Sequence, residues 1–241
     1  MNTRKRLVAL AVAAAAGACG VAPVVYAQNG FTIEEVVVTA RKRAENLQEV
    51  PIAITAIDEQ TLQRAVVERP GDYIGLIPNV TIVDTANVGD TQVSIRGIVS
   101  TRDAESTFAY VVDGILSTNP NSFNEELFDV QQVEVLKGPQ GALYGRNAVA
   151  GAILVTTKAP TEEFEGKITV GAGNQDLRKL SGTVSGPIVG DTVLGRLSFS
   201  TRQDDGSYSN TFSGRDGVVD FIEDDSLRAR VTWDVNPDLR L

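Results

Sequence analysis

The 241-residue sequence has no histidine, a single cysteine (Cys19) and only 6% aromatic residues. The lack of histidine excludes imidazole metal sites and every mechanism that needs an imidazole base. One cysteine cannot form an intramolecular disulfide or a CxxC redox or zinc motif. Acidic residues outnumber basic ones by 31 to 22, which gives a net charge of −9. Nucleic acid is therefore not expected as a partner, because phosphate binding needs a basic face.

Long apolar runs are also missing after the first 27 residues, so the sequence predicts no transmembrane helix. Its hydrophobic content of 42% is nevertheless enough for a packed core. No nucleophile–base pair stands at a recognisable spacing, so we expect no enzyme and no cofactor. Acidic clusters at 204–205 and 223–225 lack the EF-hand spacing, and no metal site is predicted.

The first 27 residues have the pattern of an export signal. Residues 4–6 are basic, residues 7–18 form a short apolar stretch, and residues 25–27 end in alanine, as signal peptidase prefers. We expect cleavage after Ala27; a buried N-terminal helix and a lipid-modified Cys19 are the alternatives. An exported chain without a transmembrane helix is periplasmic, secreted or an outer-membrane β-barrel.

The next two parts of the sequence differ in composition and in the structure that they predict. Residues 28–50 form a polar, flexible leader with one apolar patch at 33–38, which could pair with another protein's sheet or serve as an edge strand of the following domain.

The sequence of residues 51–160 predicts an α+β domain with a mixed β-sheet and short helices. Helices are expected from Asp58 to about Val67 and from Asp72 to before Pro78, each capped by its aspartate. Strands are expected at 80–83, 92–96, 108–112, 133–136 and 151–157, with a compact turn-rich loop at 138–145.

From Gly166 onward the apolar residues recur with a period of two, most clearly in 227–235. We expect four strands, at 167–174, 180–186, 193–200 and 227–235, with a long acidic connection from Arg202 to Asp225. Strands of this length with short turns at one end and long loops at the other are typical of outer-membrane barrels. A soluble antiparallel sheet with one wet face has the same alternation.

Several motifs resemble those of TonB-dependent outer-membrane receptors. The TonB box of that family is similar to the run Ile33, Glu34, Glu35, Val36, Val37, Val38, Thr39 and Ala40. Their plug domain is similar to residues 51–160, through the motifs Val93–Gly97, Tyr110–Gly114 and Val133–Asn147 in the family's order. The resemblance favours a barrel over a soluble sheet. It divides the chain into a signal peptide (1–27), a leader (28–50), a plug (51–160) and the first antiparallel strands of a large transmembrane β-barrel (166–241).

The resemblance also implies a function. Family members import scarce substrates, often ferric siderophores, across the outer membrane, and the TonB C-terminal domain pulls on the box as an added strand. We therefore expect a monomer in outer-membrane lipid, with its plug facing the periplasm, a ferric siderophore as cargo and TonB bound at residues 33–40.

The resemblance also implies roles for individual plug residues. Arg96 and Arg146 resemble plug arginines that pair with acidic groups of the barrel wall. Glu134 and Lys137 are candidate plug–barrel contacts or members of a wet strand face. Plug turns are expected at Gly97, Asp113, Gly114, Gly138, Gly141, Gly145 and Gly151.

The chain is shorter than the resemblance to this family leads us to expect. Plugged barrels of this kind have about 22 strands, and at the strand density of residues 166–241 such a barrel would need about 400 residues. We therefore expect the N-terminal fragment of an importer. A free-standing periplasmic plug-like binding module and a truncated, non-functional receptor are the alternatives.

Overall fold

The computed structural model describes residues 36–84, 91–100, 105–118, 120–207, 211–212, 214, 221–236 and 239–240. The chain divides into two compact units, Met1–Glu34 and Glu35–Leu241, and every described residue belongs to the second. The predicted export signal, Cys19 and residues 33–35 lie outside the described ranges, as do residues 208–210, 213 and 215–220 of the predicted acidic connection. Within the described ranges, no helix is long and apolar enough to cross a membrane.

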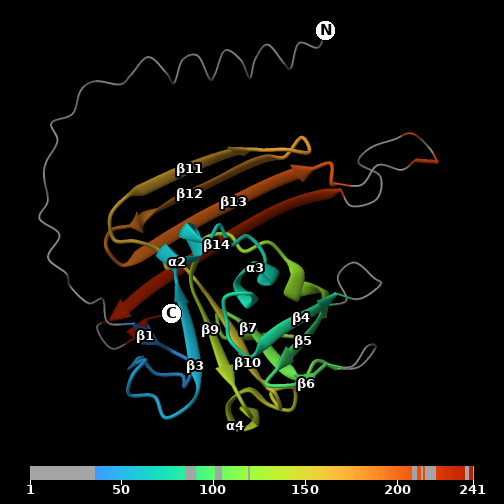
Figure 1. The fold of residues 1–241 in the computed structure, drawn as a ribbon. Helices are drawn as coiled ribbons and strands as arrows, with labels where there is room; N and C mark the ends of the chain where they lie inside the picture. The colour runs from blue at the N-terminus through green and yellow to red at the C-terminus, as the bar shows by residue number, and fades with distance from the viewer. Residues whose placement is uncertain are drawn as a thin grey trace, which may run out of the picture. The chain divides into compact units, whose positions relative to one another are not determined.

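The predicted plug is built on a five-stranded mixed sheet (Figure 1). Its strand order is β3 (Ile54–Asp58), β9 (Val130–Lys137), β10 (Gly151–Thr157), β7 (Phe108–Val112) and β8 (Ile115–Ser117). β10 runs parallel to β7, and the other neighbouring pairs are antiparallel. β10 and the second half of β9 are buried, as expected for central strands rich in branched apolar residues. The α+β class with a mixed sheet is thus confirmed.

A smaller antiparallel sheet accompanies it. Its strands are β4 (Val80–Asp84), β5 (Thr91–Ile95) and β6 (Ile98–Val99). A 3-10 helix, η1 (Pro120–Asn124), follows β8. The side chain of Phe123 in η1 reaches the main core, where its ring makes edge contacts with Phe108 and Tyr110 at centroid distances of 5.2 Å.

Two short helices carry the apolar side chains that fill the core between these sheets. α2 (Glu59–Arg64) begins as predicted, with the Asp58 side chain accepting the Thr61 N–H at 2.8 Å. α3 (Pro70–Ile74) begins earlier than predicted, because Asp72 lies inside its first turn. The Asp72 carboxylate reaches back to accept the N–H groups of Glu68 and Arg69, both at 2.9 Å.

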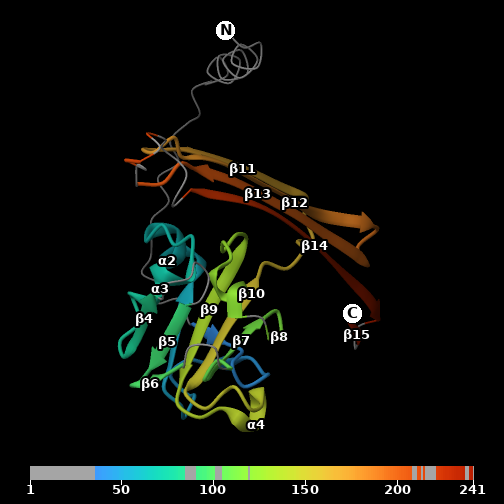
Figure 2. The same cartoon turned by 90° about the vertical axis from the view of Figure 1, so that its right-hand side faces the viewer.

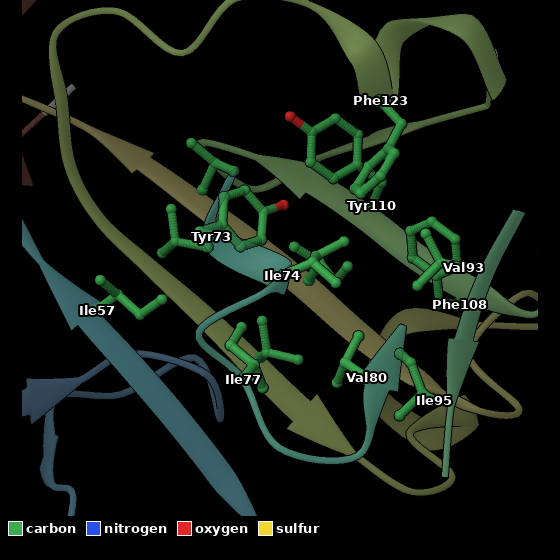
Figure 3. Packing of buried hydrophobic residues seen from close by; sticks show 14 of the residues in the cluster. Ile57, Tyr73, Ile74, Ile77, Val80, Val93, Ile95, Phe108, Tyr110 and Phe123 are labelled. Atoms are coloured by element: carbon green, nitrogen blue, oxygen red, sulfur yellow. The ribbon is translucent and has the colours of Figure 1, made fainter. Parts of the chain in front are cut away.

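The main core lies between the five-stranded sheet and the helices (Figure 3). Tyr73, Ile74 and Ile77 from the α3 region pack with residues of the sheets, among them Ile95 and Val93. Tyr73, Val93 and Ile95 are fully buried. The core therefore fixes β9 and β10, the two strands that carry the long Val133–Asn147 motif and its continuation.

The loop predicted at 138–145 contains a further short helix, α4 (Gly141–Tyr144). It connects β9 to β10, which pair with each other directly. The turn residues that flank α4 were predicted, but the helix was not. Four residues are too few to give a periodic signal in the sequence.

The C-terminal part is an antiparallel sheet of long strands, drawn side by side in Figure 2. In order, they are β11 (Glu165–Ala172), β12 (Arg178–Val189), β13 (Val193–Asp204), β14 (Ile222–Asn236) and the short β15 (Leu239–Arg240). We call this the wall sheet. The acidic connection is shorter than predicted, because Glu223, Asp224 and Asp225 belong to β14 and pair with residues 201–203 of β13.

Candidate functional site

The described part of the segment that resembles a TonB box, residues 36–40, is docked in a hairpin; we call it the coupling segment. β1 (Val37–Val38) pairs antiparallel with β2 (Glu45–Asn46), and the Val36 carbonyl accepts the Leu47 N–H at 2.9 Å. The Val38 side chain is 1% exposed. Residues 36–50, which were predicted as part of a flexible leader, lie against the folded domain, where Val38 and Ala40 are buried.

Glu134 of β9 is the main polar contact of the coupling segment. Its Oε1 accepts the Thr39 N–H at 2.8 Å and the Thr39 hydroxyl at 3.0 Å. The Gln132 amide also donates to this oxygen and donates to the Val37 carbonyl at 3.2 Å. Glu134 is fully buried, and its Oε2 has no hydrogen-bond partner among the described residues. It thus holds the leader, and within the described chain it forms no hydrogen bond or ion pair with the wall sheet.

Tyr144 of α4 completes this contact. Its hydroxyl donates to the Ala40 carbonyl at 2.6 Å, and the Ala40 side chain is buried in a small cluster with Leu136, Ala152 and neighbouring residues. Burial, followed by the nearby Glu134 charge, raises the pKa of Tyr144 to about 12. The hydroxyl therefore stays protonated at physiological pH and remains a donor.

The wall sheet has its apolar face outward and its polar face toward the plug. In β14, the odd positions from Leu227 to Val235 are exposed, and Leu227, Val231 and Trp233 are 75%, 60% and 50% exposed. On β13, polar Ser198 and Ser200 are buried while apolar Leu197 and Phe199 are exposed. This arrangement is opposite to that of a soluble sheet, which buries its apolar face.

Arg196 of β13 joins the wall sheet to the plug. Its Nε and Nη2 donate to the two carboxylate oxygens of Asp129 at 2.7 and 2.6 Å, and its Nη1 donates to Glu165 at 2.7 Å. The Arg196 and Asp129 side chains are only 5% and 8% exposed. Although burial acts to raise it, hydrogen bonds from Arg196 and Ser198 hold the pKa of Asp129 below its ordinary value.

A second charged cluster lies farther along the same sheet face. The Lys179 ammonium pairs with Glu68 at 2.9 Å and with the fully buried Glu126 at 2.5 Å. Arg202 also pairs with Glu68. Burial opposes ionisation of Glu68, but hydrogen bonds and charge from Lys179 and Arg202 lower its pKa. Acidic plug groups thus meet basic wall groups.

The predicted turn at Asp113 takes part in a third contact. The Asp113 carboxylate accepts the N–H and the hydroxyl of Thr157 at 2.8 and 2.7 Å. Arg230 of β14 donates to the Thr157 carbonyl at 3.0 Å and lies 3.8 Å from Asp113. Nearby, Arg228 donates to the Phe128 carbonyl at 2.8 Å, with its guanidinium over the Phe128 ring.

The structure places the four predicted plug–barrel residues elsewhere. Arg96 is exposed, and its guanidinium lies close to Gly138. Arg146 is 83% exposed and pairs with Glu105 of the plug at 2.7 Å. Lys137 donates to the Pro78 carbonyl at 3.3 Å, and burial together with Arg96 lowers its pKa. None of the four forms a hydrogen bond or ion pair with the wall strands that the structure describes, so their pairing with further wall strands stays a prediction.

Sequence reasoning missed the residues that do form the plug–wall contact. They include Glu68, Glu126 and Asp129 on the plug and Lys179, Arg196, Arg202, Arg228 and Arg230 on the wall. One available signal was the recurrence of basic residues on the polar face of β13 and β14. The acidic partners lie 53 to 134 residues away from the basic residues along the chain, for example Glu126 from Lys179 and Glu68 from Arg202.

Most of the predicted turn glycines have a physical reason to be glycine. Gly97, Gly114, Gly138 and Gly145 have positive φ angles of 84°, 83°, 115° and 84°. Gly151 permits close strand packing, because a Cβ there would lie 2.2 Å from the Leu136 carbonyl oxygen. Gly141 has neither feature, since a Cβ would meet open space.

The described residues contain no cluster of three or more His, Cys, Asp or Glu side chains that could hold a metal ion. The arrangement instead consists of a docked leader segment on β9 and a set of ion pairs between two sheets. These features suit mechanical coupling and assembly.

Comparison with known proteins gives a consistent result. Residues 46–152 match the model of the TonB-dependent receptor plug domain. The pesticin receptor of Yersinia pestis is 30% identical over 184 residues, which are 76% of this chain and 27% of the relative. The vitamin B12 transporter BtuB of Vibrio vulnificus is 33% identical over 179 residues, which are 71% of this chain and 28% of the relative.

A solved structure agrees with these relatives. The crystal structure of the ferric yersiniabactin uptake receptor FyuA from Yersinia pestis has a TM-score of 0.70 and 27% identity, covering 76% of this chain and 29% of that one. The chain thus spans little more than a quarter of the length of these proteins. Proteins of this kind are transporters, not enzymes. The chain belongs to the TonB-dependent receptors and corresponds to their N-terminal plug domain and the start of the barrel.

Proposed function

We propose that the chain forms the plug, the TonB-binding segment and the first wall strands of an importer in the outer membrane. Export uses the signal at residues 1–27. The apolar outer face of the wall sheet contacts lipid, and the plug presents its leader to the periplasm. TonB binds residues 33–40 as an added strand and pulls on them.

The observation that carries this proposal is that the wall sheet exposes its apolar face and is bound to the plug by ion pairs on its polar face. Exposed apolar side chains on β11 to β14 include Ile168, Val170, Leu227, Val231 and Trp233. In water such a face would be an aggregation site, whereas in lipid it is favourable. This disfavours a free-standing periplasmic module, which needs no outward apolar sheet.

The proposed cargo is a ferric siderophore. The supporting relative is the ferric yersiniabactin uptake receptor of Yersinia pestis. The similarity to a vitamin B12 transporter makes vitamin B12 the contrasting cargo for the test.

Uptake in cells tests this function. Cells that express the gene encoding this chain, and lack other siderophore receptors, are given 55Fe-labelled siderophores or labelled vitamin B12, with TonB present or deleted. We expect iron uptake that disappears without TonB. Uptake of vitamin B12 alone would show that vitamin B12, and not a ferric siderophore, is the cargo. Uptake of either substrate in cells without TonB would contradict TonB-dependent import.

A further inference from the structure

Three arginines gather on the inner face of β13 and β14. Arg196 of β13 lies directly opposite Arg230 of β14, and Arg228 lies opposite Ser198. Arg228 and Arg230 are two residues apart on one strand, so their side chains share this face. We call Arg196, Arg228 and Arg230 the arginine cluster. Like charges at directly opposed positions destabilise a sheet, so such a cluster calls for anions beside it.

Asp129 of the plug fills a site that is built for an oxyanion. Its carboxylate accepts the Nε and Nη2 donors of Arg196 at 2.7 and 2.6 Å, and it also accepts the Ser198 hydroxyl. A guanidinium fork with a hydroxyl beside it matches the geometry of any carboxylate, whether the carboxylate belongs to the plug or to another molecule.

The other two arginines have looser partners. Arg230 lies 3.8 Å from Asp113, beyond hydrogen-bond distance, and Arg228 donates to the Phe128 carbonyl, which is uncharged. On the wall side, Glu165 pairs with Arg196 at 2.7 Å. The cluster therefore carries more positive charge than Glu165 can balance, and plug carboxylates supply further negative charge.

A cavity of about 570 Å³ adjoins this site. Its lining includes Asp129, Phe128 and Leu62 on the plug and Arg196 and Thr183 on the wall, so the cavity lies between the plug and the wall sheet. A molecule in this cavity can reach the Arg196 guanidinium once the Asp129 carboxylate has moved away.

We propose that the arginine cluster is an oxyanion-binding site, which the Asp129 carboxylate occupies at rest and which an oxyanion of the cargo occupies when that carboxylate leaves. The site itself stands on the contacts above. Its use by a cargo rests on the proposed function, and it assigns the cargo to iron chelates with free carboxylate or similar oxyanion groups. Arg196 binds the oxyanion directly, and Arg228 and Arg230 add positive charge beside it.

Asp129→Gly empties the site without straining the backbone. Asp129 has a φ of 54°, which glycine adopts readily, and acetate has the shape and charge of the side chain that is lost. Asp176→Gly is the matched control, because Asp176 has a φ of 55° and also pairs with an arginine, but in an exposed position. The double variant Asp129→Gly/Arg196→Met lacks the site altogether. All variants are made in the full chain.

The first readout is the melting temperature with sodium acetate, with acetamide, which is the neutral analogue of acetate, or with sodium chloride at the same ionic strength. We expect Asp129→Gly to melt below the parent and acetate to restore most of the loss in a saturable way, because a ligand that binds the folded state stabilises it. Acetamide and chloride should not restore it, and the control and the double variant should show no shift specific to acetate.

An acetate shift of Asp129→Gly that is no larger than the acetamide shift would overturn the site, as would an equal shift in the double variant. If Asp129→Gly is unfolded without acetate, recovery of the parent's circular dichroism spectrum in acetate replaces the melting temperature. If it stays unfolded in every medium, Asp113→Gly decides in its place, because Asp113 has a φ of 48° and lies beside Arg230.

The second readout is retention of an iron chelate by vesicles that carry each variant. The probes are 55Fe-citrate, which has free carboxylates, and 55Fe-ferrichrome, which is neutral. We expect Asp129→Gly to bind ferric citrate about tenfold more tightly than the parent and the double variant do, which corresponds to about 1.4 kcal/mol. Ferrichrome should be retained equally by all. Restoration by acetate without preferential retention of ferric citrate would overturn the assignment to an anionic chelate.

Neither readout involves TonB or uptake. Positive results from both, in a chain whose iron uptake does not depend on TonB, would support the oxyanion site and contradict the proposed function. TonB-dependent iron uptake without restoration by acetate would support the proposed function and overturn the oxyanion site.

Discussion

Arg196 of the wall sheet and Asp129 of the plug form a buried, two-pronged ion pair, with hydrogen bonds of 2.7 and 2.6 Å. The fork of a guanidinium fits both oxygens of a carboxylate, which fixes orientation as well as distance. Asp129 immediately precedes β9, and β9 carries Glu134 and the docked coupling segment. One strand thus links the wall contact to the leader contact.

Loss of this arginine should be costly. Arg196→Met removes the cation and leaves Asp129 buried beside the wall, which is expected to lower the free energy of unfolding by about 3–5 kcal/mol. Denaturant unfolding followed by circular dichroism measures the change. Arg178→Met is the matched control, because the Arg178–Asp176 pair is exposed and its loss should have no measurable effect. Equal effects of the two substitutions would show that Arg196 does not anchor the plug.

Acid should weaken the same contact. The pKa of Asp129 is lowered in the folded protein, so its contribution to stability is fully present above the unfolded value of about 3.9 and is lost as pH falls through the folded value. Unfolding measured from pH 6 to pH 3 should show a fall in stability below about pH 4. Asp129→Asn should be less stable at pH 6 and should show a shallower fall, whereas Asp176→Asn should follow the parent. A parent curve that is flat below pH 4 would contradict this origin.

Gly151 should not tolerate a side chain. A Cβ would lie 2.2 Å from the Leu136 carbonyl oxygen and 3.1 Å from Ile95, so Gly151→Ala must separate β10 from β9. We expect a loss of about 1–3 kcal/mol in the free energy of unfolding. Gly141→Ala, in open space within α4, should be neutral or slightly stabilising. Thermal melts compare the two, and similar melting temperatures would argue against close packing at Gly151.

Trp233 reports directly on the outer face of the wall sheet. It is the one tryptophan of the sequence and is 50% exposed on that face. In vesicles that contain brominated lipid, its fluorescence should be strongly quenched, because its ring contacts acyl chains or the interface. Acrylamide, a quencher in water, should have little effect. The opposite order of quenching would place this face in water.

The sequence predicted β14 well but not its environment. Alternation in residues 227–235 determines which side chains share a face, and β14 (Ile222–Asn236) contains the expected strand but begins five residues earlier. Alternation does not say which face meets water, because a soluble sheet and a membrane wall have the same period. The contacts of Arg228 and Arg230 with the plug show that the polar face is the inner one.

Glu134 is a residue whose motif could be recognised from the sequence but whose burial could not be predicted from it. It alternates with Val133 and Val135, and such a pattern favours a wet strand face. It is buried because a segment 95 residues earlier in the chain covers it. The motif containing Glu134 could be recognised from sequence, but its partner could not, because no local pattern links Thr39 to β9. Arg96 and Arg146, also recognised by motif, form no hydrogen bond or ion pair with the described wall strands.

Binding of the TonB C-terminal domain to the full chain tests the central claim most directly. Val37→Pro removes a backbone N–H and restricts the preceding residue, so it should abolish strand pairing in the coupling segment. Ala44→Pro, at an exposed position between β1 and β2, is the control. We predict binding by the parent and by Ala44→Pro and none by Val37→Pro. No binding by the parent, or equal binding by Val37→Pro, would contradict a TonB-coupled receptor.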